Sequence, residues 1–157
     1  MGRRHSERTD VLGLVSFGFF LALIGVIFMI TPNLWGEIRA FFRDFQLKEV
    51  RPDAHFPTPK SHHQVLYDAA FQFCLAFAIS QILILIGRFI LRESIDRKSG
   101  TFSGLFFWFG AAAALNLLSE RSIGWFEFWG WIIILVGTVV VVRGTISLCT
   151  RALLKKR

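Results

Sequence analysis

The chain has 157 residues, of which 54% are hydrophobic and only 18% are charged, and its formal net charge is +7. Soluble domains have about a quarter of their residues charged, and one of this length could not bury so much apolar surface, so a water-soluble domain is excluded. The basic residues flank apolar runs, as contacts to anionic lipids do, and we therefore expect membrane lipids rather than nucleic acid as partners. The length indicates one domain, 1–157.

The first apolar run covers 11–30 and contains no charged residue. At about 1.5 Å per residue a helix of this length is about 30 Å long, which matches the hydrocarbon core of a bilayer. We predict a membrane span at 11–30 after a short cytoplasmic segment at 1–10. The run is too long for a cleaved signal peptide, which favours a retained anchor.

The longest stretch between apolar runs is the outer loop, 31–64. In its first half apolar side chains recur at steps of three and four, which predicts an amphipathic helix at about 33–46. These side chains are Leu34, Trp35, Ile38, Phe41, Phe42 and Phe45. Thr31 or Asn33 is suited to cap the helix. Such a helix lies in the membrane interface or docks on the outer end of the transmembrane helices.

The second half of the outer loop is rich in proline. Pro52, Pro57 and Pro59 lie within a few residues of one another. Proline lacks a backbone N–H and restricts the residue before it to extended conformations. We therefore expect extended segments without regular structure between the amphipathic helix and the next span.

Three further apolar runs complete the pattern. They predict spans at 65–91, 102–118 and 125–142, joined by an inner loop at 92–101 and an outer turn at 119–124. The basic tail, 143–157, starts with a stretch that can prolong the last helix along the inner interface. The predicted fold class is all-α: an integral membrane four-helix bundle with the amphipathic helix in its first outer loop.

The charges of the flanks predict the orientation. If the N-terminus is inside, Lys and Arg are more numerous in the inner flanks than in the outer ones. The positive-inside rule then puts both termini in the cytoplasm of a multi-pass cell-membrane protein. Aromatic anchors agree with this orientation, since they fall at the proposed outer interface: Trp35, Tyr67, Trp125, Trp129 and Trp131.

Small residues recur along three of the predicted spans. They are Gly18, Ala22 and Gly25 in the first span, Gly104, Gly110, Ala111 and Ala114 in the third, and Gly130, Gly137 and Gly144 in the fourth. Stripes of this kind let helix backbones approach closely in lipid. The fourth-span stripe predicts a compact bundle, or a contact between copies if that face points outward.

Three of the four histidines surround the start of the second span: His55, His62 and His63. Histidines near Asp53 or Asp68 are candidate ligands for zinc or copper. The alternative is a polar segment at headgroup level, with Ser61 capping the second span. Adjacent His62 and His63 are poorly arranged for joint chelation, which favours the alternative.

Polar residues within the spans form a second set of candidates: Asp68, Gln72, Gln81, Asn116 and Glu127. Such groups usually face another helix or a water-filled space. Asp68 and Gln72, one turn apart near the outer end of the second span, line a polar pocket or simply suit the first turn of a helix. For Gln81 we expect a hydrogen bond between helices, with Asn116 as partner. Glu127 lies at headgroup depth, close to Arg121.

Motifs of nucleotide binding, hydrolysis and thiol exchange are absent from the sequence. No histidine lies within a span, which argues against haem ligation in the bilayer. The thiols of Cys74 and Cys149 have no second cysteine at C-x-x-C spacing and are interpreted as inert. We therefore expect neither a cofactor nor an enzyme with all its machinery in this chain.

Three segments carry a resemblance: RTDVLGLVSFGFF, ITPNLW and FPTPKSHHQVLYDAAFQF, within residues 8 to 90. Together they resemble a group of small, uncharacterised multi-span membrane proteins of archaea. Those proteins share a charged Thr-Asp pair before the first span and a Pro-x-Pro loop before the second. The resemblance implies a multi-span membrane fold and supplies no activity and no functional residue.

Three functional hypotheses follow. The first is a structural or accessory subunit that packs in a homo-oligomer or a larger membrane complex. The second is a small oligomeric channel or transporter, with the face of Asp68, Gln72 and Gln81 lining the route. The third is a metal-dependent site in the outer histidine loop. Fold alone does not rank them, because helical bundles host many functions.

Overall fold

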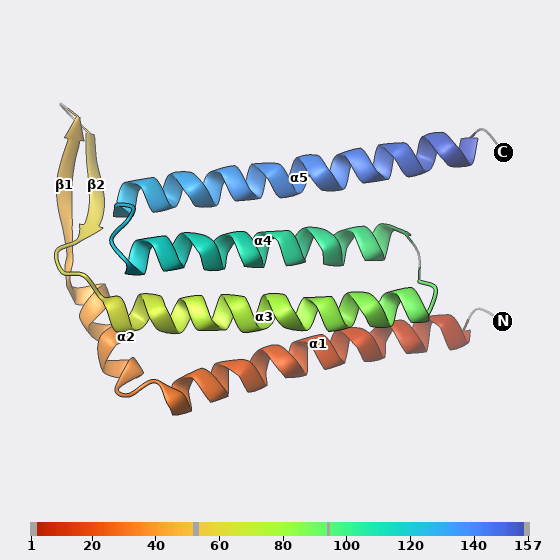
Figure 1. Ribbon diagram of the computed structural model, residues 1–157, viewed down its shortest axis with the longest axis horizontal. Coiled ribbons are helices and arrows are strands. Elements are labelled where there is room, and N and C mark those ends of the chain that lie inside the picture. Colours follow the sequence, from red (N-terminus) through yellow and green to blue (C-terminus); the bar gives the residue numbers. More distant parts are fainter. Residues whose placement is uncertain (1–2, 52–53, 94, 156–157) are drawn as a thin grey trace.

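The computed structural model describes residues 3–51, 54–93 and 95–155. They form five helices and one two-stranded hairpin, in the order α1–α2–β1–β2–α3–α4–α5 (Figure 1). Four of the helices are long and apolar enough to cross a membrane, which indicates a membrane location. These are α1 (Arg3–Ile30), α3 (Gln64–Ile90), α4 (Ile95–Ser119) and α5 (Trp125–Lys155).

Three of these helices extend beyond the apolar run that predicts them. α1 begins at Arg3, within the expected N-terminal segment, and α4 begins at Ile95, within the expected inner loop. α5 continues through the basic tail to Lys155. The added segments are rich in Arg, Lys and Leu, which have high helix propensity. Helical structure therefore continues past the apolar stretches that fit the hydrocarbon core.

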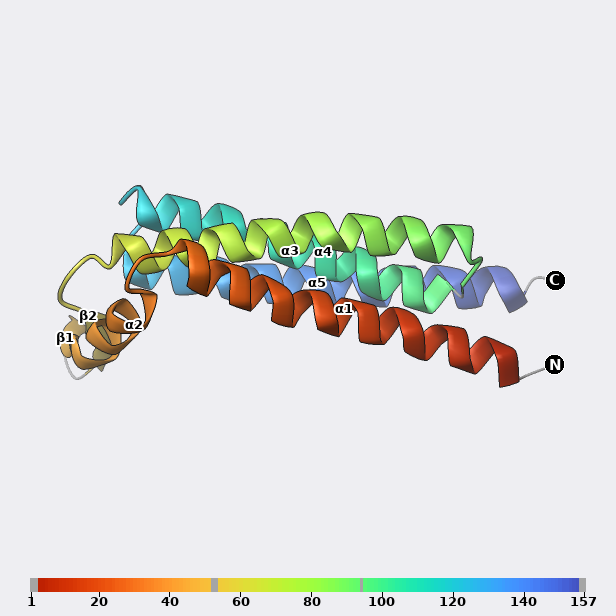
Figure 2. The same cartoon turned by 90° about the horizontal axis from the view of Figure 1, so that it is seen from below.

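The four long helices lie in a row rather than in a closed bundle. α3 packs most extensively on α4, α4 packs on α5, and α1 lies along α3. The lateral order is α1, α3, α4, α5, so that α1 and α5 form the two edges (Figure 1). The view from below agrees, with α1 in front and α5 behind α3 and α4 (Figure 2). The start of α1 and the end of α5 lie at the same end of the molecule.

The core lies between the two central helices. Within the apolar spans of α3 and α4, 28% and 33% of the residues are buried, against 6% in each of α1 and α5. Cys74, Ala111 and Ala112 form one buried cluster, with Phe73 and Trp108 packed against it. Alanines at this contact let the two backbones approach closely, which is how helices associate in lipid.

Helix α2 (Leu34–Arg43) docks on the ends of the long helices. Leu34 is buried in a cluster with Ile27 of α1 and Ala69 of α3. Trp35 and Phe42, on the same helix, are exposed. The apolar stripe that predicts this helix is thus divided: one part packs on the protein and the other faces outward.

The hairpin departs from the all-α prediction. β1 (Phe45–Arg51) and β2 (Ala54–Pro59) pair antiparallel, with Phe45 opposite Pro59 and Leu47 opposite Pro57. The expectation of no regular structure here is wrong, and Phe45 belongs to β1 instead of the helix. Pro57 and Pro59 are two residues apart, so their missing N–H groups fall on one side of β2. A two-stranded ribbon has such an unpaired side and tolerates proline there.

Candidate functional site

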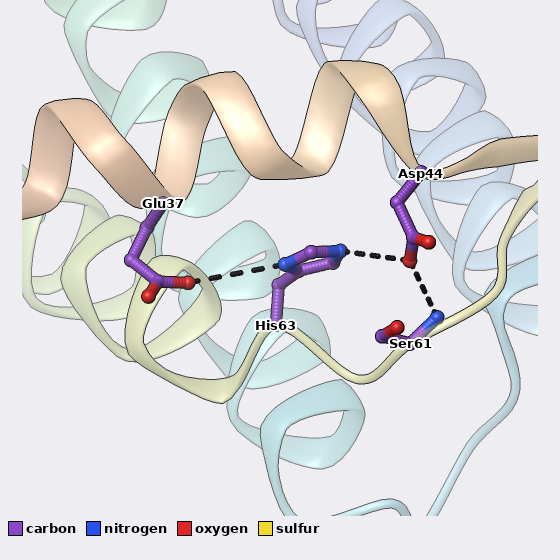
Figure 3. Close-up of polar contacts among 4 residues, drawn as sticks. All are labelled: Glu37, Asp44, Ser61 and His63. Atoms are coloured by element: carbon purple, nitrogen blue, oxygen red, sulfur yellow. Dashed lines mark hydrogen bonds and ion pairs between the residues drawn. The ribbon is translucent and has the colours of Figure 1, made fainter.

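The most connected polar site lies where α2, the hairpin and the start of α3 meet (Figure 3). His63 precedes α3 and is only 8% exposed. Its Nε2 lies 3.1 Å from Asp44 Oδ2, and its Nδ1 lies 3.9 Å from Glu37 Oε2. Glu37 is in the first turn of α2 and Asp44 follows its last residue. One imidazole therefore bridges the two ends of α2.

Asp44 connects this helix end to the segment that enters α3. Its carboxylate accepts a hydrogen bond from the backbone N–H of Ser61 at 2.6 Å. Its carbonyl accepts one from the N–H of Lys60 at 3.1 Å. The Ser61 N–H, together with His63, holds the pKa of the Asp44 carboxyl below its usual range, against the opposing effect of desolvation. The carboxylate is thus stabilised in its ionised form.

The protonation state of His63 decides how many of its two carboxylate neighbours face an N–H of the ring; the contact with Asp44 has hydrogen-bond length, and the one with Glu37 has only ion-pair length. A neutral imidazole has one N–H, which on Nε2 donates to Asp44 and leaves Nδ1 facing Glu37 without a proton. The imidazolium has a donor for each carboxylate. Chemically, this arrangement can hold a proton between two acids. We call the set of Glu37, Asp44, Ser61 and His63 the latch, because its contacts join α2 to the segment that enters α3.

An aromatic shell encloses one side of this latch. The ring of Phe41 makes edge-to-face contacts with His63, Tyr67 and Trp125, at centroid distances of 5.4, 6.4 and 5.7 Å. Trp125 also donates its indole N–H to the carbonyl of Pro57 at 3.1 Å. The shell therefore joins α2, β2, α3 and α5. Aromatic pairs in this geometry contribute about 0.5–1.5 kcal/mol each beyond the area they bury.

His62 has a separate partner on α4. Its Nε2 lies 2.8 Å from the carbonyl oxygen of Ser119, and the Ser119 hydroxyl donates to Asp68 of α3. These two links close the ends of α3 and α4 against each other. Beside them is an open pocket of about 320 Å³, whose polar lining includes Lys60, His62 and Arg121.

The three histidines are not gathered into one site. His55 lies on β2 and is exposed, while His62 and His63 direct their rings to Ser119 and Asp44. Within 3–51, 54–93 and 95–155 no group of three His, Cys, Asp or Glu side chains is placed to hold a metal ion. Ser61 does not cap α3, because His63 takes the cap position and Ser61 instead donates to Asp44.

The polar residues of the spans are also separated. Asp68 and Gln72 line one pocket of about 300 Å³ with the end of α1, whereas Gln81 lies deeper along α3. The expected bond between Gln81 and Asn116 is wrong, because Asn116 donates to Glu120, one turn later on α4. Antiparallel packing brings the start of α3, not its middle, to the end of α4.

Glu127 has a local structural role. It accepts a hydrogen bond from the backbone N–H of Gly124 at 2.8 Å and lies in the first turn of α5. A glutamate that reaches back to an N–H just before a helix satisfies one of the unpaired donors there. Although Arg121 is close to Glu127 in the sequence, the ion pairs among the described residues do not include one between them.

Sequence reasoning missed Glu37 and Asp44 as partners of His63. In the sequence both residues lie off the apolar stripe of the amphipathic helix, where solvated polar side chains are expected. Their spacing of seven does put them on one face of the helix, which is a usable signal for a common partner. The partner, His63, is brought next to α2 by the path of the hairpin. The periodicity of the sequence does not predict that path.

Comparison with models of known protein families, with curated proteins and with solved structures finds no match.

Proposed function

We propose that this protein is a structural or accessory subunit of a membrane complex, and that it associates with a second copy of itself through α5. The observation that carries the proposal is a stripe of glycines on the outward face of that helix. The latch at the hairpin end supports the same role, because it joins α2 to the segment that enters α3 and so fixes the shape of the subunit at that end.

The glycine stripe of α5 points away from the rest of the chain. Leu135, 6% exposed, packs toward α4. Gly137 is two positions later, so it points about 200° away around the helix. A Cβ built on Gly130, Gly137 or Gly144 would meet no described atom within 4 Å. The stripe is thus unused within a single chain.

The residues beside this stripe suit a contact between helices. Ile133 and Val140 flank it on one side and Ile134 and Val141 on the other, and all four are at least 62% exposed. β-branched side chains have little rotamer freedom in a helix, so they lose little conformational entropy when they pack against another helix. A glycine groove between β-branched ridges supports close helix packing in lipid, where apolar contact with lipid and with protein is otherwise equivalent.

The opposite edge of the row has a similar face. Gly18 and Gly25 of α1 are exposed, and a Cβ on either would meet no described atom within 4 Å. By contrast Ala111 and Ala114 of α4 are buried within the chain. Of the small-residue stripes, those on the two edge helices are therefore the ones available to another chain.

The test is self-association of the full chain in lipid vesicles, measured by energy transfer between labelled copies as the protein-to-lipid ratio is varied. Gly137→Ile is expected to weaken association at least about fivefold, because overpacking costs about 1–3 kcal/mol. Val136→Ile, one position along and 48% exposed, is the matched control and should leave association unchanged. A chain that stays monomeric, with no partner co-purifying from native membranes, would contradict the proposal.

The proposed orientation has both termini in the cytoplasm and the hairpin outside the cell membrane. It is supported by the basic residues near the ends of α1 and α5. In this orientation the exposed side chains of Trp35 and Phe42 suit the outer membrane interface. A cysteine placed at Lys48, exposed on β1, should react with a membrane-impermeant thiol reagent added to intact cells. Reaction only after lysis would reverse the orientation.

A second candidate is an oligomeric channel or transporter. It is favoured by the pocket that Asp68 and Gln72 share near the outer end of α3. Such a route requires water to reach Gln81, deeper on the same helix. With the native cysteines replaced, Gln81→Cys should then react with a water-soluble thiol reagent, as Gln72→Cys should, whereas Ile133→Cys serves as the lipid-facing control. No reaction at Gln81→Cys would remove this candidate.

A further inference from the structure

The end of the molecule opposite the hairpin contains a groove with both apolar and polar walls. It has a volume of about 300 Å³ and is lined by Leu85 and Phe89 of α3, Lys98, Ser99 and Phe102 of α4, and Ile146 of α5. Within the described residues, only Lys98 and Ser99 give it polar groups. The two lie side by side in the first turns of α4, and the rest of the groove is aliphatic or aromatic.

We propose that this groove binds one anionic phospholipid, with the headgroup phosphate at Lys98 and Ser99 and an acyl chain along Phe102 and Ile146. The proposal goes beyond association through α5, because the groove lies on the inner side of that helix, toward α3 and α4. It depends only on the chain lying in a membrane. The occupant is inferred from the charge, the unpartnered hydroxyl and the apolar walls.

The first argument is the unused hydrogen-bonding capacity at the groove. Ser99 is 7% exposed, and its hydroxyl has no hydrogen-bond partner among the described residues. A helical serine ordinarily finds a carbonyl one turn back, as Thr101 does with Arg97 at 3.2 Å. A buried polar group without a partner costs free energy, so an oxygen acceptor from a ligand would stabilise this site.

The second argument is the position of the charge. The ammonium of Lys98 lies 4.5 Å from the centroid of the Phe89 ring, which holds the side chain beside the groove. None of the ion pairs among the described residues includes Lys98. The groove also lies at the N-terminal end of α4, where unpaired backbone N–H groups and the helix dipole favour an anion.

The surroundings of the groove are basic overall. From the last turn of α3 to the first turn of α4 (88–98), the sequence has four basic residues, Arg88, Arg92, Arg97 and Lys98, and two acidic ones, Glu93 and Asp96. Glu93 lies 3.4 Å from Arg88, so its charge is compensated locally. Clusters of basic residues directly beside a span attract anionic headgroups. A zwitterionic lipid of the same chain length offers the same apolar contacts but adds a cation beside Lys98, and is therefore disfavoured.

The experiment is native mass spectrometry of the full chain in detergent micelles, titrated with phosphatidylglycerol or with phosphatidylcholine of the same acyl chains. We expect one phosphatidylglycerol to bind more tightly than phosphatidylcholine. Lys98→Gln should weaken phosphatidylglycerol binding by about fivefold, the contribution of one basic residue near an anionic surface. Lys98→Arg should retain most of the affinity. Ser99→Ala, which is compatible with a helix, should also weaken binding.

The matched control is Lys60→Gln, which removes an exposed lysine at the hairpin end and should leave lipid binding unchanged. Inorganic phosphate at millimolar concentration should not displace the lipid, because the apolar walls contribute to affinity. Equal binding of the two lipids, an unchanged affinity in Lys98→Gln, or displacement by inorganic phosphate would each overturn the proposal. Self-association through α5 is measured separately and is not altered by any of these outcomes.

Discussion

Gly110 of α4 lies directly against Leu135 of α5. A Cβ on Gly110 would overlap one methyl group of the leucine side chain and crowd the other, at 3.0 Å. Two residues farther along α5, a Cβ on Gly137 would meet no described atom within 4 Å. On one side of α5, Leu135 packs against Gly110 of α4. The opposite side of α5 contains Gly137 and is open. This asymmetry separates substitutions that test the fold from substitutions that test association.

Substitution of Gly110 by alanine is expected to destabilise the fold. The added methyl group forces Leu135 to move or separates α4 from α5, and overpacking of this kind costs about 1–3 kcal/mol. The free energy of unfolding in micelles, measured by denaturant titration, should fall accordingly. Gly137→Ala is the control: it meets open space and gains helix propensity, so unfolding should not become easier.

Combining the substitution with a smaller partner sharpens this test. Gly110→Ala together with Leu135→Ala should recover part of the loss, because the second change removes the atoms that the first one overlaps. The two effects should therefore be clearly non-additive in a double-mutant cycle. Strict additivity would show that the two residues are not in contact.

Removal of the His63 ring should lower the local stability of α2 and the hairpin without affecting the interface between α3 and α4. His63→Ala leaves Glu37 and Asp44 without their shared partner and opens space beside Phe41. Backbone amides of α2 and the hairpin should exchange hydrogen faster, by a factor of about ten if about 1.4 kcal/mol of local stability is lost. Amides of the α3–α4 interface should be unchanged. His55→Ala, an exposed histidine on β2, is the control and should change neither region.

Acid should weaken the same region through Asp44. The pKa of this carboxyl is held below its ordinary value of 3.8, first by the Ser61 N–H and then by His63. Because the folded pKa is lowered, the carboxylate stabilises the fold above pH 3.8, and this contribution is lost as the pH falls through the folded pKa. Asp44→Asn removes the titrating group. Hydrogen exchange of the hairpin measured between pH 5 and pH 3, about the range where this group begins to protonate, should depend less on pH in the variant. If hydrogen exchange of the hairpin depends on pH equally in the native chain and in Asp44→Asn, Asp44 is not the group responsible.

The sequence predicts the four long apolar helices because each contains an apolar run about as long as the hydrocarbon core is thick. It does not predict their lateral order. The spans are apolar around most of their circumference, so hydrophobicity alone does not distinguish a face toward protein from a face toward lipid. The small-residue stripes predict a compact four-helix bundle, whereas the row with α1 and α5 at its edges depends on which side chains the small residues meet, as Gly110 meets Leu135.

The hairpin was missed for a different reason. β1 reads FQLKEVR, with few β-branched residues, and β2 contains Pro57 and Pro59. Both features lower the strand signal. The pairing is stable because the ribbon is anchored at both ends of its base, by Asp44 to Lys60 and by Trp125 to Pro57. Anchors of this kind are tertiary contacts, and a local pattern cannot report them.

Ser119 connects the ends of α3 and α4 in two ways that mutation can separate. Its hydroxyl donates to Asp68, and its carbonyl oxygen lies 2.8 Å from the ring of His62. Ser119→Ala removes only the first link and leaves a partly buried carboxylate without that donor. The free energy of unfolding should fall by about 1–3 kcal/mol. Ser122→Ala, an exposed serine in the neighbouring turn, is the control and should have little effect. When Ser119→Ala is added to Asp68→Ala, the further decrease in the free energy of unfolding should be smaller, because the acceptor of the Ser119 hydroxyl is already absent. An equally large decrease would show that Ser119 stabilises the fold through another contact.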